Sequence, residues 1–501
     1  MGVSEKMYKE SLKIRRRLAK NYSNLHIYEL FLADTLNNLA ILYSKTQRFG
    51  DSEKMHKESL EIRRRLAEKN PLVYEPKIAI SLSNLAVLYF KMRRFGDSEK
   101  MHKESLEIYR RLAVNNPKTY EPHVAVTLNN FANLYSEVQR FSESERMHKE
   151  ALEIYRCLAE NSPQIYEPKL AISLNNLADV YNKTRRFSEG EQMYKEALEI
   201  RRRLAEDSPQ AYEPYVAETL NNLALLYSTT QRFSESEQMY KEALAIRRRL
   251  AEDSPQAYEL YVAETLNNLA LLYSATQRFS ESEQTYKEAL VIRRRLAEES
   301  PQIFELFVAE TLENLALLYF ETQHFSESES AYKEALEMYR RLADNNLQLY
   351  GSVVANILVC LAVLYSEIRC FSKSEATYKE ALEIERHLED NNQKLSESEV
   401  ANIFCGLAFN SIFICKYAES ENYARKGLEI DSTNSLLYSN LAPSLLFQGK
   451  YDEAEKIYCQ YKDELVEVFL SDFDDFEGAN AIPGEYKKDV ERIRIMLTEG
   501  K

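Results

Sequence analysis

Apolar side chains recur along the chain with the spacing of an amphipathic α-helix. Leu36, Leu39, Ala40 and Tyr43 occupy positions i, i+3, i+4 and i+7, which form one stripe of a helix with about 3.6 residues per turn. A short Thr-Gln-Arg-Phe turn follows, and a second amphipathic pattern comes next. Its most regular form is Tyr-Lys-Glu-Ala-Leu-Glu-Ile at residues 194–200. The pattern predicts antiparallel helix pairs.

This two-helix pattern repeats every 46 residues. The block Thr-Leu-Asn-Asn-Leu-Ala-Ile-Leu-Tyr begins at residue 35, and related blocks begin at residues 81, 127, 173, 219, 265 and 311. Weaker copies near residues 357 and 407 keep the register, and the final step shortens to 34 residues. One amphipathic hairpin leaves its apolar face exposed, whereas stacked hairpins bury it in a continuous core. We therefore expect an all-α solenoid of stacked antiparallel helix pairs without a sheet.

Local signals predict where these helices begin and end. Ser234, Ser280 and Ser326 each precede a glutamate by three residues, which predicts a capping box at the start of the second helix. Arginine triplets, such as residues 201–203, lie near the end of that helix, where cations suit the helix dipole. A proline then ends the helix, and it recurs as Pro71, Pro117, Pro163, Pro209, Pro255 and Pro301.

The elements Leu-Asn-Asn-Leu-Ala-x-Leu-Tyr, Arg-Phe and Tyr-Lys-Glu-Ala-Leu-Glu-Ile resemble a tetratricopeptide repeat, and most of all the long repeats of kinesin light chains. The common tetratricopeptide unit has about 34 residues. The extra residues are expected to lengthen the helices and the connection between repeats. The resemblance covers roughly residues 1–460. It implies a right-handed superhelix whose first helices line a concave, peptide-binding groove.

The pattern divides the chain into three segments. Residues 1–19 match a second helix without its first helix, residues 20–460 carry the repeats, and residues 461–501 leave the pattern. Phe469 and Phe473 predict one helix in the last segment, and Pro483 precedes another, so that we expect a helical cap. Terminal repeats normally present a polar outer face. We therefore expect the end at residues 4–18 to fray or to self-associate.

The face opposite the core stripe of the first helix is the expected binding surface. Turning about 100° per residue from Leu36 places Asp34, Asn37, Asn38, Ile41 and Lys45 there. A carboxamide offers a donor and an acceptor to the backbone of an extended peptide. The resemblance implies that Asn at this place contacts ligand backbone; alternatively, each Asn bridges to a neighbouring helix. The asparagines are Asn38, Asn84, Asn130, Asn176, Asn222, Asn268, Asn314 and Asn440. Those in the diverged repeats, Asn84 and Asn440, carry most weight, because recent duplication copies any residue.

The rest of this face changes character along the chain. Early repeats place Lys45, Lys91 and Lys183 near it, together with Phe90. Later repeats place Leu225, Leu271 and Leu317 there, with the acids Glu218, Glu264, Glu310, Glu321 and Glu367. Each charge alone is typical of a solvated helix face. As a set they predict a polar groove, graded in charge sign, with an apolar floor in its middle.

Composition narrows the choice of partners. The net charge of −14 argues against a phosphate-backbone binder. We find no apolar run near the roughly 20 residues that span a bilayer, and no signal peptide. Six scattered cysteines suit a reducing compartment. We therefore expect a cytoplasmic protein that binds neither nucleic acid nor membrane.

Catalytic signatures are missing from the sequence. No Gly-rich phosphate loop, zinc motif or nucleophile elbow appears, so we expect neither enzymatic activity nor a metal or cofactor. His56, His102 and His148 recur at 46 residues where other repeats have Tyr, which favours packing over metal ligation. The first hypothesis is a scaffold that binds a peptide or protein segment in the groove. The alternative is a sensor or regulatory module of a larger or neighbouring effector enzyme system, which the missing first half-repeat favours.

Overall fold

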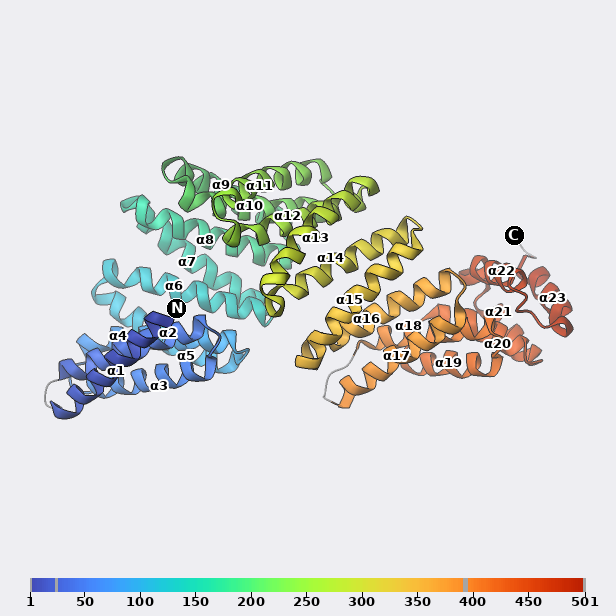
Figure 1. Ribbon diagram of the computed structural model, residues 1–501, viewed down its shortest axis with the longest axis horizontal. Coiled ribbons are helices and arrows are strands. Elements are labelled where there is room, and N and C mark those ends of the chain that lie inside the picture. Colours follow the sequence, from blue (N-terminus) through green and yellow to red (C-terminus); the bar gives the residue numbers. More distant parts are fainter. Residues whose placement is uncertain (1, 23–25, 391–394, 499–501) are drawn as a thin grey trace. The chain divides into compact units, whose positions relative to one another are not determined.

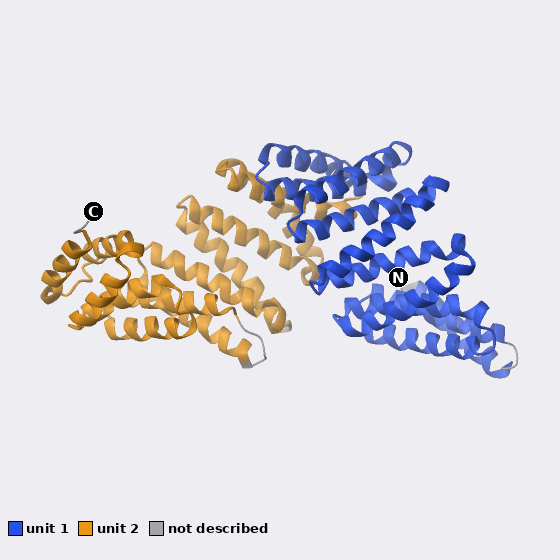
Figure 2. Cartoon of the chain, turned by 180° about the vertical axis from the view of Figure 1, so that it is seen from behind, with its two compact units in different colours: residues 1–253 blue, residues 254–501 orange. Residues whose placement is uncertain are grey.

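The computed structural model describes residues 2–22, 26–390 and 395–498, and every regular element in these ranges is a helix. Met1 and residues 499–501, at the ends of the expected terminal segments, lie outside the described part. The chain divides into two compact units, Met1–Asp253 and Ser254–Lys501 (Figure 2). Within each unit, helices that follow one another in sequence pack as antiparallel pairs (Figure 1). The expected all-α solenoid of stacked pairs is confirmed.

Unit 1 is built from eleven helices among the described residues. Its first helices are α2 (His26–Lys45), α4 (Pro71–Lys91), α6 (Pro117–Glu137), α8 (Pro163–Lys183) and α10 (Pro209–Thr229). Its second helices are α1 (Gly2–Asn21), α3 (Phe49–Ala67), α5 (Phe95–Asn115), α7 (Phe141–Asn161), α9 (Phe187–Asp207) and α11 (Phe233–Asp253). The helix α1 packs on α2, and its Met7 and Ile14 are exposed. Fraying or self-association of this end stays a prediction.

Unit 2 continues the same plan with helices that shorten toward the C-terminus. Its first helices are α12 (Pro255–Ala275), α14 (Pro301–Glu321), α16 (Leu347–Glu367), α18 (Glu397–Phe413) and α20 (Ser435–Leu446). Its second helices are α13 (Phe279–Glu299), α15 (Phe325–Asn345), α17 (Phe371–Asp390), α19 (Tyr417–Ile430) and α21 (Tyr451–Gln460). Two further helices, α22 (Lys462–Gly478) and α23 (Lys487–Thr498), follow, with the 3-10 turn η1 (Gly484–Tyr486) between them. They bury Phe469, Phe473, Phe476, Ile493 and Leu497.

The extra length of the repeat lies in the helices alone. The helix α5 ends at Asn115 and α6 begins at Pro117, so that one residue connects the two repeats. Proline suits the first position of a helix, because a backbone N–H at that position would have no hydrogen-bond acceptor within the helix. The expectation of a longer connection is therefore wrong. Proline begins the next helix directly after the previous one has ended.

The hairpin turns reverse the chain through one residue in the left-handed conformation. In the first turn Gln47 has φ 58°, Arg48 N–H donates to Tyr43 O at 2.9 Å, and Gln47 N–H donates to Ser44 O at 3.2 Å. These two bonds form a Schellman motif, which satisfies the last carbonyls of the first helix. The same conformation recurs at Arg93, Gln139, Arg185, Gln231, Gln277, Gln323, Arg369 and Cys415.

The start of the second helix differs from the expected capping box. The N-cap of α13 is Arg278, and that of α15 is His324, and neither makes a side-chain cap hydrogen bond. Ser280, Ser326 and, in α11, Ser234 lie inside the first turn. The left-handed residue of the turn fixes where the helix begins. The first helical residue is the phenylalanine directly before the serine that matched the motif. A capping box forms at α18 instead, between Ser396 and Glu399.

A buried serine ties the two helices of a hairpin together. Ser282 Oγ donates to Ala270 O at 2.8 Å, and its side chain is fully buried. The same bond joins Ser52, Ser98, Ser144, Ser236, Ser328, Ser374 and Ser420 to the equivalent alanine. Gly190 replaces this serine in α9, where an added Cβ would lie 2.6 Å from Asn182 Oδ1. The space of the missing hydroxyl is thus filled by Asn182.

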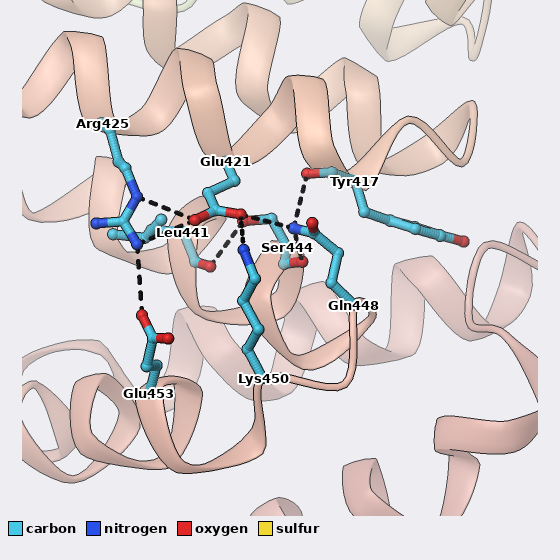
Figure 3. A network of polar contacts seen from close by, with 8 residues as sticks. All are labelled: Tyr417, Glu421, Arg425, Leu441, Ser444, Gln448, Lys450 and Glu453. Carbon is cyan, nitrogen blue, oxygen red and sulfur yellow. Dashed lines mark hydrogen bonds and ion pairs between the residues drawn. The ribbon is translucent and has the colours of Figure 1, made fainter.

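Polar clamps join successive repeats. Glu191 on α9 accepts hydrogen bonds from Arg232 Nη1 at 2.6 Å and Tyr227 Oη at 3.0 Å, both in the next repeat. Burial raises the pKa of Glu191, but bonds from Arg232, Lys195 and Tyr227 outweigh it and lower the pKa to about 2. Figure 3 shows the version in unit 2, where Glu421 accepts from Lys450, Gln448 and Arg425.

The arginine triplets join successive repeats and also the two helices of one repeat. Arg202 on α9 pairs with Glu242 on α11 at 2.5 Å, and Arg203 pairs with Glu167 on α8 at 2.6 Å. Arg201 is buried. The triplets therefore bind neighbouring helices, in addition to the expected interaction with their own helix dipole.

The helix α16 contradicts the expectation that no apolar run approaches the length needed to span a bilayer. Among the described residues, α16 is long and apolar enough to cross a membrane by length and composition. In the fold it packs against α15 and α17, and Val354, Leu358 and Leu361 are buried there. The helix thus has the surroundings of a core helix in a helical stack.

Candidate binding surface

The first helices leave one recurring stripe uncovered. In α10 the stripe consists of Tyr215, Glu218, Asn222, Leu225 and Thr229, which are exposed except for the half-buried Asn222. Their spacings of three and four residues place them on one side of the helix. The equivalent residues of the other long first helices lie at 46-residue intervals from these. We call the surface that they form in each unit its first-helix face.

The asparagines of this stripe fall into two groups. Asn38 is exposed, and Asn130, Asn176, Asn222, Asn268 and Asn314 are half-buried. Within residues 2–22, 26–390 and 395–498, the side chains of Asn38, Asn130, Asn176, Asn222 and Asn314 form no hydrogen bond to another residue. Their carboxamides are free to meet a ligand.

The two asparagines from the diverged repeats have structural partners. Asn84 Nδ2 donates to Asn37 Oδ1 of the preceding repeat at 3.0 Å. Asn440 is buried, and its Nδ2 donates to Cys405 O on α18 at 3.2 Å. The greater weight given to this pair as ligand contacts is therefore wrong. They bridge adjacent first helices.

The neighbouring asparagine also differs from expectation. Asn37 is buried, and its counterpart Asn129 donates to Ser173 Oγ of the next repeat at 2.6 Å. One residue turns a helical side chain by about 100°, which here points it toward the next first helix instead of toward solvent. Asn37 therefore belongs to the interface between repeats, and only Asn38 lies on the exposed face.

The other predicted residues are placed as follows. Lys45 and Lys91 are exposed, and Lys183 Nζ donates to Ser136 Oγ at 3.0 Å. Phe90 is half-buried and packs against the core, so that it is not part of the face. Leu225, Leu271 and Leu317 are 54%, 43% and 48% exposed. Glu218, Glu264, Glu321 and Glu367 are exposed, and Glu310 is half-buried.

The sequence reading missed arginines that reach this face from the second helices. Arg201 on α9 is buried, and its Nη1 donates to Tyr215 O at 2.9 Å and to Glu218 Oε2 at 3.1 Å. Arg293 on α13 likewise donates to Phe307 O at 2.7 Å and lies 3.9 Å from Glu310. Burial lowers the pKa of both guanidinium groups, and the nearby carboxylates oppose that shift.

A fixed spacing in the sequence between each of these arginines and an acid of the face could have indicated them. Arg201 and Arg293 precede the face acids Glu218 and Glu310 by 17 residues. Where Tyr109 and Tyr155 replace the arginine, the face residue is Val126 or Ile172. Both of these apolar side chains are exposed, at 41% and 42%. The pairing is not general, because the buried Arg63 precedes the apolar Ile80 by the same spacing.

Stacked helix pairs with one exposed stripe per pair define a helical-repeat solenoid. The tetratricopeptide repeat model matches residues 31–111, 77–156, 169–249 and 261–341. The chain belongs to the tetratricopeptide repeat family. No curated protein matches the sequence.

Several solved structures are similar to this chain. BtubC (BKLC) from P. vanneervenii is 27% identical over 50% of this chain and 92% of its own, with a TM-score of 0.42. The apo form of the quorum sensor NprR from B. thuringiensis is 14% identical over 76% of this chain and 97% of its own, with a TM-score of 0.48. Aspartyl phosphate phosphatase F from Bacillus subtilis is 12% identical over 75% and 89%, with a TM-score of 0.47.

Proposed function

We propose that the chain is a non-enzymatic cytoplasmic scaffold that binds an extended peptide or protein segment along its first-helix faces. The observation that supports this is a pairing repeated on successive helices, in which a carboxamide lies one turn before an exposed apolar side chain. Asn222 with Leu225, and Asn314 with Leu317, are examples. The carboxamide serves the ligand backbone. The apolar side chain gains about 25 cal/mol per Å² when a ligand covers it.

Site-specific crosslinking tests where a partner binds. A photoreactive amino acid at Leu225 on the first-helix face should capture a defined partner segment from cells. The matched control is the same amino acid at Val114, which is 83% exposed on the second helix α5. Equal capture from both positions, or capture from Val114 alone, contradicts the proposal.

A double substitution separates binding from stability. Asn176→Ala with Asn222→Ala removes two carboxamides that have no partner in the described part of the chain. The melting temperature should stay unchanged or rise slightly, because Ala is the better helix former by roughly 0.5 kcal/mol per site. Crosslinking at Leu225 should be lost. A destabilised variant that still captures its partner would assign these asparagines to the solenoid instead.

A further inference from the structure

The first-helix face of unit 2 carries a row of exposed apolar side chains. Leu271 on α12, Leu317 on α14 and Val363 on α16 occupy the same position in three successive repeats and are 43%, 48% and 40% exposed. The helices α12 and α14 adjoin each other, since Ser274 Oγ donates to Glu321 Oε2 at 3.4 Å. Each of the three helices thus presents one exposed apolar side chain at the same position to an apolar ligand group.

Acidic side chains flank this row on both sides. Glu310 lies on its N-terminal side, and Glu321 and Glu367 lie on its C-terminal side. The stripe positions of α12, α14 and α16 hold no lysine or arginine. In unit 1, by contrast, α4 presents Lys77 and Lys91, and α8 presents Lys169 and Lys183. Unit 2 therefore offers apolar and negative groups together.

Internal cations compensate these carboxylates poorly. Arg293 lies 3.9 Å from Glu310 and donates its hydrogen bonds to Phe307 O and Thr311 Oγ1. Burial raises the pKa of Glu310, and the charge of Arg293 opposes that shift. Within the described residues, Glu321 and Glu367 form no ion pair. A cationic ligand would stabilise the charged form of these carboxylates.

The spacing typical of neighbouring helices suits one ligand conformation. Helices in contact lie roughly 8–10 Å apart, and α12 and α14 are in contact. A chain in the polyproline II conformation advances about 3.1 Å per residue with three residues per turn, which is about 9 Å per turn. At that advance, every third side chain would meet the next first helix, and the residues between would face the flanking carboxylates.

We propose that the first-helix face of α12, α14 and α16 binds an extended cationic segment of a partner protein, with an apolar side chain at every third residue and Lys or Arg between. This inference rests on the proposed function and names its ligand chemistry. The apolar side chains rest on Leu271, Leu317 and Val363. The cations pair with Glu310, Glu321 and Glu367.

Fluorescence anisotropy with the full chain tests the inference. The probe is a labelled twelve-residue peptide of Val-Pro-Lys repeats, in which proline favours the extended conformation. One control carries Glu in place of Lys, and another carries Ser in place of Val. The Lys probe should bind at least tenfold more tightly than either control, and its affinity should fall as salt concentration rises. Equal binding of the Glu control overturns the inference.

A matched pair of variants locates the site. Glu321→Gln with Glu367→Gln should weaken binding of the Lys probe at least tenfold. Glu298→Gln with Glu337→Gln removes the same charge from exposed positions on the second helices α13 and α15 and should leave binding unchanged. Equal effects of both pairs assign the binding to net charge and overturn the site. If no probe binds while Leu225 still crosslinks a cellular segment, the inference fails and the proposed function stands.

Discussion

Three histidines occupy a core position that tyrosine fills in other repeats. His56, His102 and His148 are buried on α3, α5 and α7, at the place of Tyr194 on α9. The ring of His102 stacks on Phe131 with centroids 5.4 Å apart, and His148 Nδ1 lies 3.0 Å from Asn129 Oδ1. The expected packing role is confirmed. Burial lowers the pKa of each imidazole to about 4.

These histidines should make unit 1 sensitive to mild acid. Their folded pKa of about 4 lies below the ordinary value of 6.5. The unfolded state therefore binds more protons between those values, and the free energy of unfolding falls as pH falls from 6.5 to 4. Each site contributes at most about 3 kcal/mol. Urea unfolding followed by circular dichroism at pH 7, 5.5 and 4.5 measures the loss.

The tyrosines of the other repeats supply the control. Replacing all three residues, as His56→Tyr, His102→Tyr and His148→Tyr, should flatten the dependence between pH 6.5 and 4.5, because tyrosine does not titrate there. An unchanged slope in this variant would assign the acid sensitivity to carboxylates.

Asp472 on α22 should oppose folding at alkaline pH. Its Oδ2 is buried without a partner among the described residues, and burial, with a smaller effect of Asp475, raises its pKa to about 7 from 3.8. The folded state binds more protons between those values, so that stability falls as pH rises through them. Asp472→Asn should therefore stabilise the chain at pH 8, by no more than about 4 kcal/mol because the side chain keeps some solvent exposure. At pH 4 the difference should nearly vanish, and equal gains at both pH values would contradict the assignment.

At the scale of the helix pair, the serine bond and its one replacement predict a coupling. Gly190→Ser alone should destabilise the chain by about 1–3 kcal/mol, because its Cβ would meet Asn182 Oδ1 at 2.6 Å. At residue 182 the neighbouring repeats have serine, as Ser136 and Ser228. Asn182→Ser should therefore be tolerated and should free the space next to residue 190. The double variant should then form the bond to Ala178 O and recover the loss. Additive effects in this double-mutant cycle would show that the two sites do not compete.

The sequence predicts the helix pairs well, because the 46-residue period and the apolar stripes each specify them independently. Helix starts were predicted less well. Ser-x-x-Glu matches a capping box, but the left-handed residue at Gln277 sets where α13 begins. Adjacent positions on the face were also hard to separate. Asn37 and Asn38 differ by about 100° in direction, and only the packing of the next repeat decides which of them is buried.

At the scale of the whole chain, a regular period makes repeats removable within a unit. Deleting residues 95–140 joins Arg94 to Phe141 in the register of the original Arg94–Phe95 bond. Stability in such stacks is roughly a sum of repeat and nearest-neighbour terms. The shortened chain should keep its mean residue ellipticity and melt only a few degrees lower. Deleting residues 95–137 instead breaks the register and should unfold unit 1; equal behaviour of the two deletions would refute the additive picture.

The same regularity has a consequence for the gene. Residues 215–251 and 261–297 differ at three positions, so that the DNA encoding them offers two nearly matching stretches one repeat apart. Unequal recombination between such stretches inserts or removes a complete helix pair without shifting the reading frame or disturbing a polar clamp. Natural isolates should therefore carry alleles that differ by whole units of 46 codons. Such alleles would differ in how many first-helix stripes they expose.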